Sequence, residues 1–538
     1  RLHLLKDHKM DSTFLPLLAP AALLIAAGAA FARPGRRPGA VLALSEAAAL
    51  LACLVALASL FVWIADGPGT SPLLGIDGIA VIGEIGIAVR IDALSVVMLA
   101  LVAFVGWLVV RYARTYLDGD PRQGYFTGWL CTALAMVLLL VQAGHLFLLA
   151  AAWVGISVSL HRLLLFYPQR PGARRAARKK SASARIGDTA LLLAVGTLAV
   201  TSGTGDIGAI GETVDEAVRA GEGGLAIHFA AGLLALAAVV KSAQFPLHGW
   251  LTEVMETPTP VSALLHAGIV NAGGFLLIRF ADVMVAAPGV LAVLVMIGGL
   301  SAVVGGLVML TQSAVKTSLA WSTIAQMGFM IMQCGLALFP LALLHIVAHS
   351  LYKAHAFLAA GAAVEGVATI RRPGPIAIPG ARSVALSFAA ALALYTLIGI
   401  AFGFDDKSPQ AIALGAILVF GVAYLLAQGL ADAAPRLLTQ RTALYSVAAS
   451  VGYFTLHEAT TWLMAGTTPA TPMPGPLEWA LIVLAVVSFG ALAVLQALFP
   501  LWAYHPAAVS LRVHIANGFY INALTNRLLG GWSIRHSS

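Results

Sequence analysis

The sequence is poor in charged residues, and this scarcity excludes most classes of water-soluble protein. Only 10% of its 538 residues are Asp, Glu, Lys or Arg, whereas 60% are hydrophobic. Soluble domains average roughly 45–50% apolar and about 25% charged residues. The chain is therefore predicted to be a polytopic membrane protein. Its formal net charge of +8 does not indicate nucleic-acid binding, because excess Lys and Arg in a membrane protein mostly mark cytoplasmic loops.

Cysteine is also scarce. Cys53, Cys131 and Cys334 all lie inside apolar segments, so they form neither a disulfide framework nor a set with metal-ligand spacing. We therefore expect no metal and no cofactor in this chain. The residues before Met10 lack a signal-peptide pattern. The sequence leaves open whether residues 1–9 are native or an added leader, with Met10 as the start.

Long apolar runs divide the chain into about 15 predicted membrane-spanning helices, because a span needs ~20 mostly apolar residues. The predicted fold is all-α. The approximate ranges are 14–31, 40–64, 92–112, 126–142, 144–167, 186–203, 226–250, 260–280, 288–311, 314–335, 340–366, 384–402, 410–430, 442–464 and 477–501.

The basic loops predict the orientation of the chain, because Lys and Arg favour the cytoplasmic side of a membrane. With these spans, all the basic loops fall on one side, and the acidic loops 66–84 and 206–222 fall on the other. The N-terminus is therefore expected outside and the C-terminus in the cytoplasm. The residues of the basic side are Arg33, Arg36, Arg37, Arg170, Arg174, Arg175, Arg178, Lys179, Lys180, Arg185, Arg371, Arg372, Arg382, Arg436, Arg441, Arg512, Arg527 and Arg535.

Lys241 lies deep in the apolar segment AIHFAAGLLALAAVVKSAQFPLHGWL. An ammonium group at bilayer depth costs at least ~3 kcal/mol on insertion scales. Pro246 follows five residues later, and broken helices in transporters commonly border ion sites. The alternatives are a snorkelling lysine and an ordinary kink. We expect Lys241 to carry a proton or cation, with Pro246 at a functional helix break.

A second group of ionisable residues follows in LLHIVAHSLYKAHAFLAAG. His345, His349 and Lys353 are spaced i, i+4 and i+8, so they are predicted to line one helix face. Histidine titrates near neutral pH, which suits a proton relay. Zinc binding and plain hydrogen bonding between helices are the alternatives, although the helix supplies no further metal ligand.

Four more residues are candidates for the same path. His266 follows a proline-rich break and could bridge Lys241 and the later histidines, or serve only as a structural histidine. Lys316 lies near the start of a helix, where a snorkelling role competes. Glu253 and Glu256 lie after Trp250 and could gate a cytoplasmic ion entry, or be solvated.

Three stretches of the sequence carry a familiar pattern, namely KSAQFPLHGWLTEVMETPTPVSALLHAGIVNAGGFLL, VKTSLAWSTIAQMGFM and LHIVAHSLYKAHAFLAAG, and RIGDTALLL (185–193) fits the same pattern. They resemble the antiporter-like subunits of respiratory complex I and of Mrp-type cation/proton antiporters. The resemblance implies two inverted five-helix repeats with broken helices, assigned here to 126–280 and 281–430. Residues 1–125 and 431–538 then form the N-terminal helices and the C-terminal helices with a cytoplasmic tail. The family's ion-path residues fall on Lys241, His266, Lys316, His345, His349 and Lys353.

The chain departs from that family at two charged positions. The family's glutamate, which pairs with the buried lysine, is Val154 here, so Glu253, Glu256 and Asp188 become the candidate counter-ions. In the second repeat only Lys407 is found, in the loop FDDKSP, so the second half-channel is in doubt. The long lateral helix of the large complex I subunit is also not expected.

These departures, with the tail HPAAVSLRVHIANGFYINALTNRL, resemble the DabB family, the membrane subunits of DAB inorganic-carbon accumulation complexes in the bacterial inner membrane. The resemblance implies a partner, DabA, a peripheral cytoplasmic zinc protein similar to β-carbonic anhydrases. This chain would then be a transporter subunit without catalysis of its own. It would supply H⁺ or Na⁺ flux while DabA hydrates carbon dioxide to bicarbonate. The alternatives are a complex I or Mrp-type antiporter subunit, and a scaffold with a dead ion path.

Overall fold

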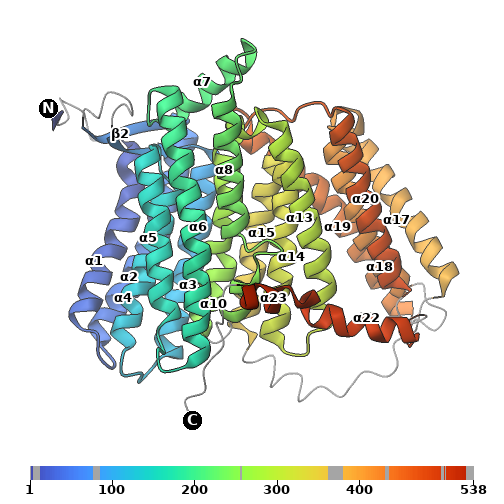
Figure 1. Ribbon diagram of the computed structural model, residues 1–538, viewed down its shortest axis with the longest axis horizontal. Coiled ribbons are helices and arrows are strands. Elements are labelled where there is room, and N and C mark those ends of the chain that lie inside the picture. The colour runs from blue at the N-terminus through green and yellow to red at the C-terminus, as the bar shows by residue number, and fades with distance from the viewer. Residues whose placement is uncertain are drawn as a thin grey trace.

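Long helices run side by side through this computed structural model, and the chain reverses direction from each to the next (Figure 1). One end carries the strands and α7. We call it the sheet end. The other end carries the loop 165–170, α22 and α23, and we call it the basic end (Figure 1). The structure describes residues 2–3, 12–76, 85–254, 257–360, 380–429, 436–498, 502 and 504–528.

The first part of the bundle contains the helices that precede the first break. Their bounds are η1 Ser12–Leu17, α1 Leu18–Ala32, α2 Gly39–Asp66, α3 Ala93–Tyr116, α4 Gln123–Val141, α5 Leu146–Leu164, α6 Pro171–Ser202, α7 Ile207–Arg219 and α8 Leu225–Lys241.

The second part begins after that break. Its helices are α9 Gly249–Glu253, α10 Thr259–Ala267, η3 Ile269–Asn271, α11 Ala272–Arg279, α12 Ala281–Val285, α13 Pro288–Met309, α14 Val315–Gly335, α15 Phe339–Leu358, α17 Ala381–Ala401, η4 Phe404–Asp406, α18 Pro409–Gly429, α19 Arg436–Met464, α20 Pro476–Ala497, α22 Pro506–Ala516, η5 Gly518–Tyr520 and α23 Ile521–Leu528.

Twelve helices in the described ranges are long and apolar enough to cross a membrane. They coincide with 12 of the 15 predicted spans. The other three predicted spans are helical as α8, α14 and α19, but α8 has only 17 residues, and α14 and α19 are not among the 12. The polytopic helical fold is confirmed, whereas the number of 15 spans is not.

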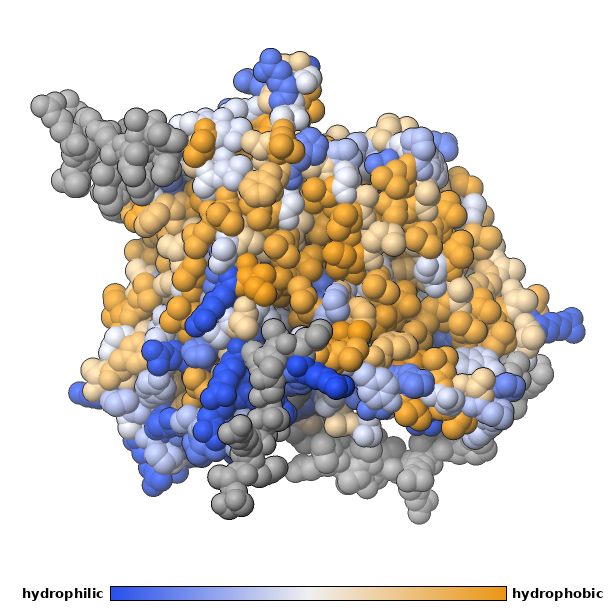
Figure 2. All heavy atoms as spheres, in the orientation of Figure 1, coloured by the Kyte–Doolittle hydropathy of each residue, from blue (hydrophilic) through white to orange (hydrophobic). Residues whose placement is uncertain are grey.

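The outer surface of the bundle follows from this composition. Figure 2 shows, on the face in view, a broad band of hydrophobic residues across the middle and hydrophilic residues concentrated towards both ends. Large apolar side chains are exposed to the surroundings; Phe61 and Leu397, for example, are each 69% exposed. In water such exposure is unfavourable, but a hydrocarbon surrounding satisfies it.

The fold is mostly helical, as predicted, and it also contains one small sheet. Strands β1 (Leu2–His3), β2 (Gly69–Ile76) and β3 (Ile85–Ile91) form an antiparallel sheet in the order β1-β2-β3. In the register Gly69 pairs with Ile91, and Ile76 pairs with Ile85. The long connection between α2 and α3 lies outside the apolar band, where strands are free to pair at the surface.

The basic run after residue 170 is a helix, although it was expected to be a loop. Helix α6 begins at Pro171 and continues for 32 residues. Proline is well tolerated at the first helical position, and the run AARKKSASA is rich in good helix formers. Lys179 and Lys180 are therefore carried into the bundle, where they are 6% and 4% exposed.

Two helix breaks face each other in the centre of the bundle. Helix α8 ends at Lys241, and turns lead to α9 at Gly249. Ala243 in these turns has a φ of +50°, a strained backbone that non-glycine residues rarely adopt. The next span is interrupted at Gly268, between α10 and η3. The break predicted around Pro246 is confirmed.

Candidate functional site

Lys241 is the last residue of α8 and is 8% exposed. Its Nζ lies 4.2 Å from the centroid of the Trp153 ring of α5. A cation over an indole face is attracted by the ring quadrupole. This contact accounts for part of the environment of the lysine, but an ammonium group inside a membrane also needs a hydrogen-bond acceptor and a counter-charge.

Ser157 and Asp188 supply both. Lys241 Nζ donates to Ser157 Oγ at 3.2 Å, and Ser157 Oγ donates to Asp188 Oδ1 at 3.0 Å. Ser157 lies one helical turn after Val154 on α5, and Asp188 comes from α6. Of the two candidate counter-ions among the described residues, Asp188 and Glu253, Asp188 is the one linked to Lys241.

Lys180 belongs to the same group, and the sequence interpretation missed it. Its Nζ donates to the backbone carbonyl oxygen of Ser157 at 2.8 Å. We call Lys180, Lys241, Ser157 and Asp188 the Lys241 cluster. A cavity of about 20 Å³ is lined by Lys180, Lys241 and Asp188, which is enough space for about one water molecule.

The packing of α8 on α11 sets the position of this cluster. A Cβ added to Gly273 would lie 2.5 Å from the carbonyl oxygen of Ala238 and 2.3 Å from Ser242 Oγ. Ser242 Oγ in turn donates to the carbonyl oxygen of Val270 at 2.9 Å. The residue after Lys241 is thus tied to the second helix break.

His266 contacts the predicted histidine helix. Its Nδ1 lies 3.0 Å from Thr323 Oγ1, and its carbonyl oxygen lies 3.2 Å from His349 Nε2. The His266 ring stacks on Phe357 with centroids 4.4 Å apart. His266 therefore joins α10 to α14 and α15.

His345, His349 and Lys353 all lie on α15, as predicted, and we call them the His ladder. The rings of His345 and His349 are 6.1 Å apart. Lys353 is fully buried, and its Nζ donates to Ser322 Oγ at 2.8 Å and to the Leu319 carbonyl oxygen at 3.1 Å. Lys316, near the start of α14, donates to Thr259 Oγ1 at 3.3 Å.

A cleft of about 560 Å³ opens beside the His ladder, between α14, α15, α18 and α19. His345 Nε2, Gln333 Oε1 and Tyr453 Oη line or face it, and these buried atoms have no hydrogen-bond partner among the described residues. Buried polar atoms are normally hydrogen-bonded, often to water. The cleft can therefore accommodate water that reaches the first histidine of the ladder.

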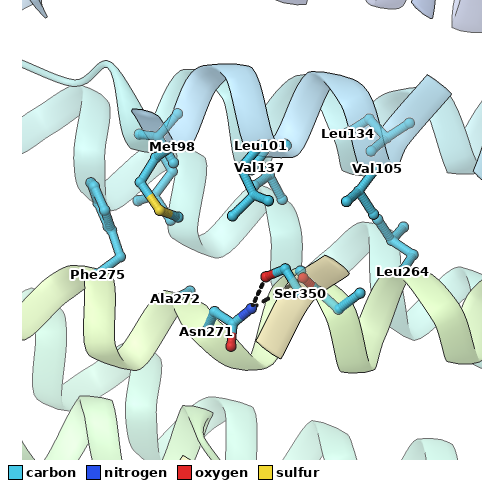
Figure 3. A pocket seen from close by; sticks show the side chains of 15 residues that line it. Met98, Leu101, Val105, Leu134, Val137, Leu264, Asn271, Ala272, Phe275 and Ser350 are labelled. Carbon is cyan, nitrogen blue, oxygen red and sulfur yellow. Dashed lines mark hydrogen bonds between the residues drawn. The ribbon is translucent and has the colours of Figure 1, made fainter. Parts of the chain in front are cut away.

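A smaller cavity lies at the second helix break, between α3, α4 and the α10–α11 region (Figure 3). Asn271 Nδ2 donates to Ser350 Oγ at 2.8 Å there, and the other lining side chains labelled in Figure 3 are apolar. Ser350 directly follows His349, so the break is bonded to the ladder helix at two consecutive positions.

Glu253 is paired rather than solvated. Its carboxylate forms an ion pair with Lys179, a second one with Arg175 at 3.3 Å, and accepts from Asn522 Nδ2 at 3.3 Å. Asn522 lies on α23, so the C-terminal tail folds back onto α6 and α9 beneath the bundle (Figure 1). Glu256 lies outside the described residues.

Lys407, the lysine noted in the second repeat, lies in the connection between α17 and α18. Lys407 caps η4 and forms an ion pair with Glu458 of α19. Helices α17 and α18 on either side of it are uninterrupted over their bounds. The second half therefore places no lysine of 384–429 in the middle of a helix, in agreement with the doubt raised by the sequence.

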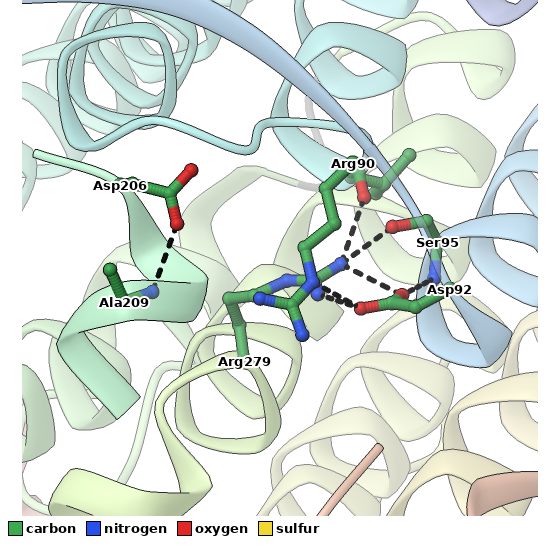
Figure 4. Close-up of polar contacts among 7 residues, drawn as sticks. Arg90, Asp92, Ser95, Asp206, Ala209 and Arg279 are labelled. Atoms are coloured by element: carbon green, nitrogen blue, oxygen red, sulfur yellow. Dashed lines mark hydrogen bonds and ion pairs between the residues drawn. The ribbon is translucent and has the colours of Figure 1, made fainter. Parts of the chain in front are cut away.

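A buried ion cluster near the sheet end holds the N-terminal part of the chain to α11 (Figure 4). Asp92 accepts from Arg90 Nε at 2.7 Å and pairs with Arg279, which also donates to Ser95 Oγ at 2.7 Å. Burial alone raises the pKa of the Asp92 carboxyl, but the two guanidinium groups and the Ser95 N–H bring it well below its usual range. The sequence interpretation missed this cluster.

Comparison with known families adds to this geometry. The family model described as NADH:quinone oxidoreductase/Mrp antiporter, transmembrane, matches residues 143–374, and the one described as complex I chain 5 N-terminus matches residues 81–127. The protein named "Probable inorganic carbon transporter subunit DabB2" of Halothiobacillus neapolitanus is 37% identical over 535 residues, covering 96% of this chain and 94% of that protein. This chain belongs to the DabB family.

Another member of the DabB family is similar over the centre of the chain. The protein named "Probable inorganic carbon transporter subunit DabB" of Hydrogenovibrio crunogenus is 48% identical over 278 residues, which are 52% of this chain and 53% of that one. Among solved structures, the Mrp complex from Dietzia sp. is similar with a TM-score of 0.65 and 22% identity, covering 96% of this chain and 59% of that chain. The antiporter-like fold and the membrane transporter class are thereby confirmed.

Proposed function

We propose that this chain conducts protons across the bacterial inner membrane and thereby energises inorganic-carbon accumulation by a cytoplasmic partner. The observation that carries the proposal is the Lys241 cluster, in which a buried ammonium group and a carboxylate meet through a serine at a strained helix break. A lysine whose carboxylate moves closer or further away gains or loses its proton. Movement at the Ala243 turn can therefore load and unload Lys241.

In the proposed path, the ion enters from the sheet end, which we assign to the outside. It passes the cleft beside His345, then His349 and His266, reaches Lys241, and leaves near Glu253. The hydrogen bond between His349 and the His266 carbonyl oxygen, and that between Ser242 and Val270, support this order. Lys353 on α15 and Lys316 on the neighbouring helix α14 supply further charges along the proposed route.

The chemistry of these groups favours H⁺ over Na⁺. Lysine and histidine bind protons directly, whereas a sodium site requires oxygen ligands. Uptake measured in sodium-free buffer over a range of pH distinguishes the two ions. Persistent uptake without sodium is expected, and its full loss would contradict the proton version.

The partner is proposed to be a DabA-like peripheral zinc protein, which hydrates carbon dioxide to bicarbonate at the basic end. Under this proposal the zinc belongs to the partner, and this chain performs no catalysis. The two relatives named as inorganic carbon transporter subunits support this assignment, because one of them matches nearly the whole chain. The complex I relatives match only about half of it, for example 52% for a chain 5 protein.

The proposal is tested by growth in air of a bacterium that lacks carbonic anhydrase. Both chains together should rescue growth, and neither chain should do so alone. Lys241→Ala should abolish rescue while the complex still assembles, whereas Arg178→Ala, an exposed position on α6, should rescue fully. Rescue by Lys241→Ala, or uptake that ignores a collapsed proton gradient, would overturn the proposal.

A further inference from the structure

Lys180 is a second buried lysine beside Lys241, and the proposed path does not yet use it. It is 4% exposed, and its Nζ donates to the Ser157 carbonyl oxygen at 2.8 Å. Its neighbour Arg178 is exposed, so the burial belongs to this position rather than to the whole basic run. A lysine held by a single neutral acceptor inside a membrane protein lacks a charge partner of its own.

The ionisable groups that act on Lys180 come from each helix packed around it. Helix α8 contributes Lys241, its own helix α6 contributes Asp188, and α5 contributes His161, which lies one turn beyond Ser157. Two lysine side chains therefore share one carboxylate. Since like charges at close range disfavour each other, protonation of one lysine favours loss of the proton from the other.

Along α6, Lys180 lies nearer the basic end of the bundle than Asp188 does. Asp188 lies eight residues after Lys180, so the backbone of Lys180 is about 12 Å nearer the basic end. Lys179, the next residue in that direction, turns to Glu253 and Asn522. Lys180 thus stands between the Lys241 cluster and the residues through which the ion is proposed to leave.

We propose that Lys180 accepts the proton that Lys241 releases and passes it towards the basic end. The inference rests on the proposed proton flux and identifies Lys180 as the group that binds the proton after Lys241. An N–H bond of Lys241 breaks as its proton moves to Ser157 Oγ, and the proton of that hydroxyl moves to Asp188 Oδ1. Lys241 is then neutral, Asp188 is protonated and Ser157 is unchanged. Asp188 next transfers its proton to neutral Lys180, which restores the carboxylate and leaves Lys180 charged.

A purely structural role makes a different prediction for the conservative variant. Arginine keeps the positive charge and can donate to the Ser157 carbonyl oxygen, but it does not release a proton in proteins. Lys180→Arg therefore preserves the positive charge and the hydrogen bond to Ser157, but removes a group that can accept and release a proton. In the complex of both chains, proton flux into vesicles, followed with a pH-sensitive dye, should fall at least tenfold for Lys180→Arg. The thermal stability of that variant should stay near the wild-type value.

Two further variants keep the test decisive. Lys180→Gln is expected to lose flux like Lys180→Arg, and Arg178→Ala should show wild-type flux. Wild-type flux in Lys180→Arg or Lys180→Gln would overturn the inference. If Lys241→Ala abolishes flux while Lys180→Arg does not, only the role of Lys180 fails. If neither variant changes flux, the proposed function itself fails.

Discussion

Asp188 supplies the negative charge of the Lys241 cluster, because it is the carboxylate that Ser157 links to Lys241. The resemblance to antiporter-like subunits implies an acid on α5, at the position of Val154 in this chain. Here Asp188 on α6 supplies the carboxylate, and the Ser157 hydroxyl lies between it and Lys241. A hydroxyl both donates and accepts, so the link can transmit a proton as well as charge.

Replacing Asp188 by Asn tests this role. Without the carboxylate, the two buried lysines lose their shared counter-charge, so their protonated forms become less favourable. Transport by the complex should fall at least tenfold, close to the effect of Lys241→Ala. Asp215→Asn on α7, at the sheet end, is the control and should transport normally.

A second substitution sharpens the result. Val154→Glu in the Asp188→Asn background places an acid on α5, at the position where the resemblance implies one. Partial recovery of transport is expected if the requirement is a carboxylate beside Lys241. Wild-type transport by Asp188→Asn alone would show that Asp188 is not the counter-ion.

Asp92 makes stability depend on pH at the sheet end. Its folded-state pKa is lowered, so its ion pairs stabilise the fold above the unfolded pKa of about 4 and are lost as pH falls through the lower folded value. The unfolding temperature of the solubilised chain should therefore drop below about pH 4. Asp92→Asn should cost about 3–5 kcal/mol at neutral pH and flatten this acid slope.

An exposed pair provides the comparison for Asp92. Asp118 pairs with Arg37 at 2.9 Å, but both side chains are more than half exposed. Ion pairs in water contribute little, so Asp118→Asn should leave the unfolding temperature nearly unchanged. Equal losses from both substitutions would contradict the distinction drawn from burial.

At the scale of elements, the break after α8 was predictable and the start of α6 was not. The buried Lys241 and the nearby Pro246 indicate the break from the sequence alone. For α6, the rule that basic residues mark loops competes with the helix propensity of an alanine-rich run, and the propensity prevails. The contact between Ser157 and Asp188 could not be predicted, because it depends on how α5 and α6 pack against each other.

The close approach of α8 and α11 can be tested through Gly273. A methyl group there would meet the backbone of Ala238, so the helices must separate just before Lys241. Gly273→Ala should destabilise the protein by about 1–3 kcal/mol and lower transport by displacing the cluster. Unfolding in denaturant, together with uptake, measures both effects.

Gly232 on the same helix α8 is the matched control. An added Cβ there meets nothing within 4 Å, and alanine is the better helix former. Gly232→Ala should therefore be neutral or slightly stabilising. If both glycine variants behave alike, the contact at Gly273 does not set the position of Lys241.

For the whole molecule, the two ends differ in charge and define an expected orientation. Glu222 follows α7 at the sheet end, and Arg174 lies on α6 at the basic end, and both are exposed. In a background without native cysteines, a membrane-impermeant maleimide added to intact cells should label Glu222→Cys and not Arg174→Cys. The opposite pattern would reverse the proposed direction of the ion path.

The contact between Asn522 and Glu253 joins residues 269 positions apart. During synthesis, Glu253 emerges long before its tail partner, and α13 to α20 must all be made in between. The ion pair of Glu253 with Lys179 is thus completed by Asn522 only after these helices have been translated. A subunit in which these later helices have not yet been made therefore lacks the contact between α23 and α9.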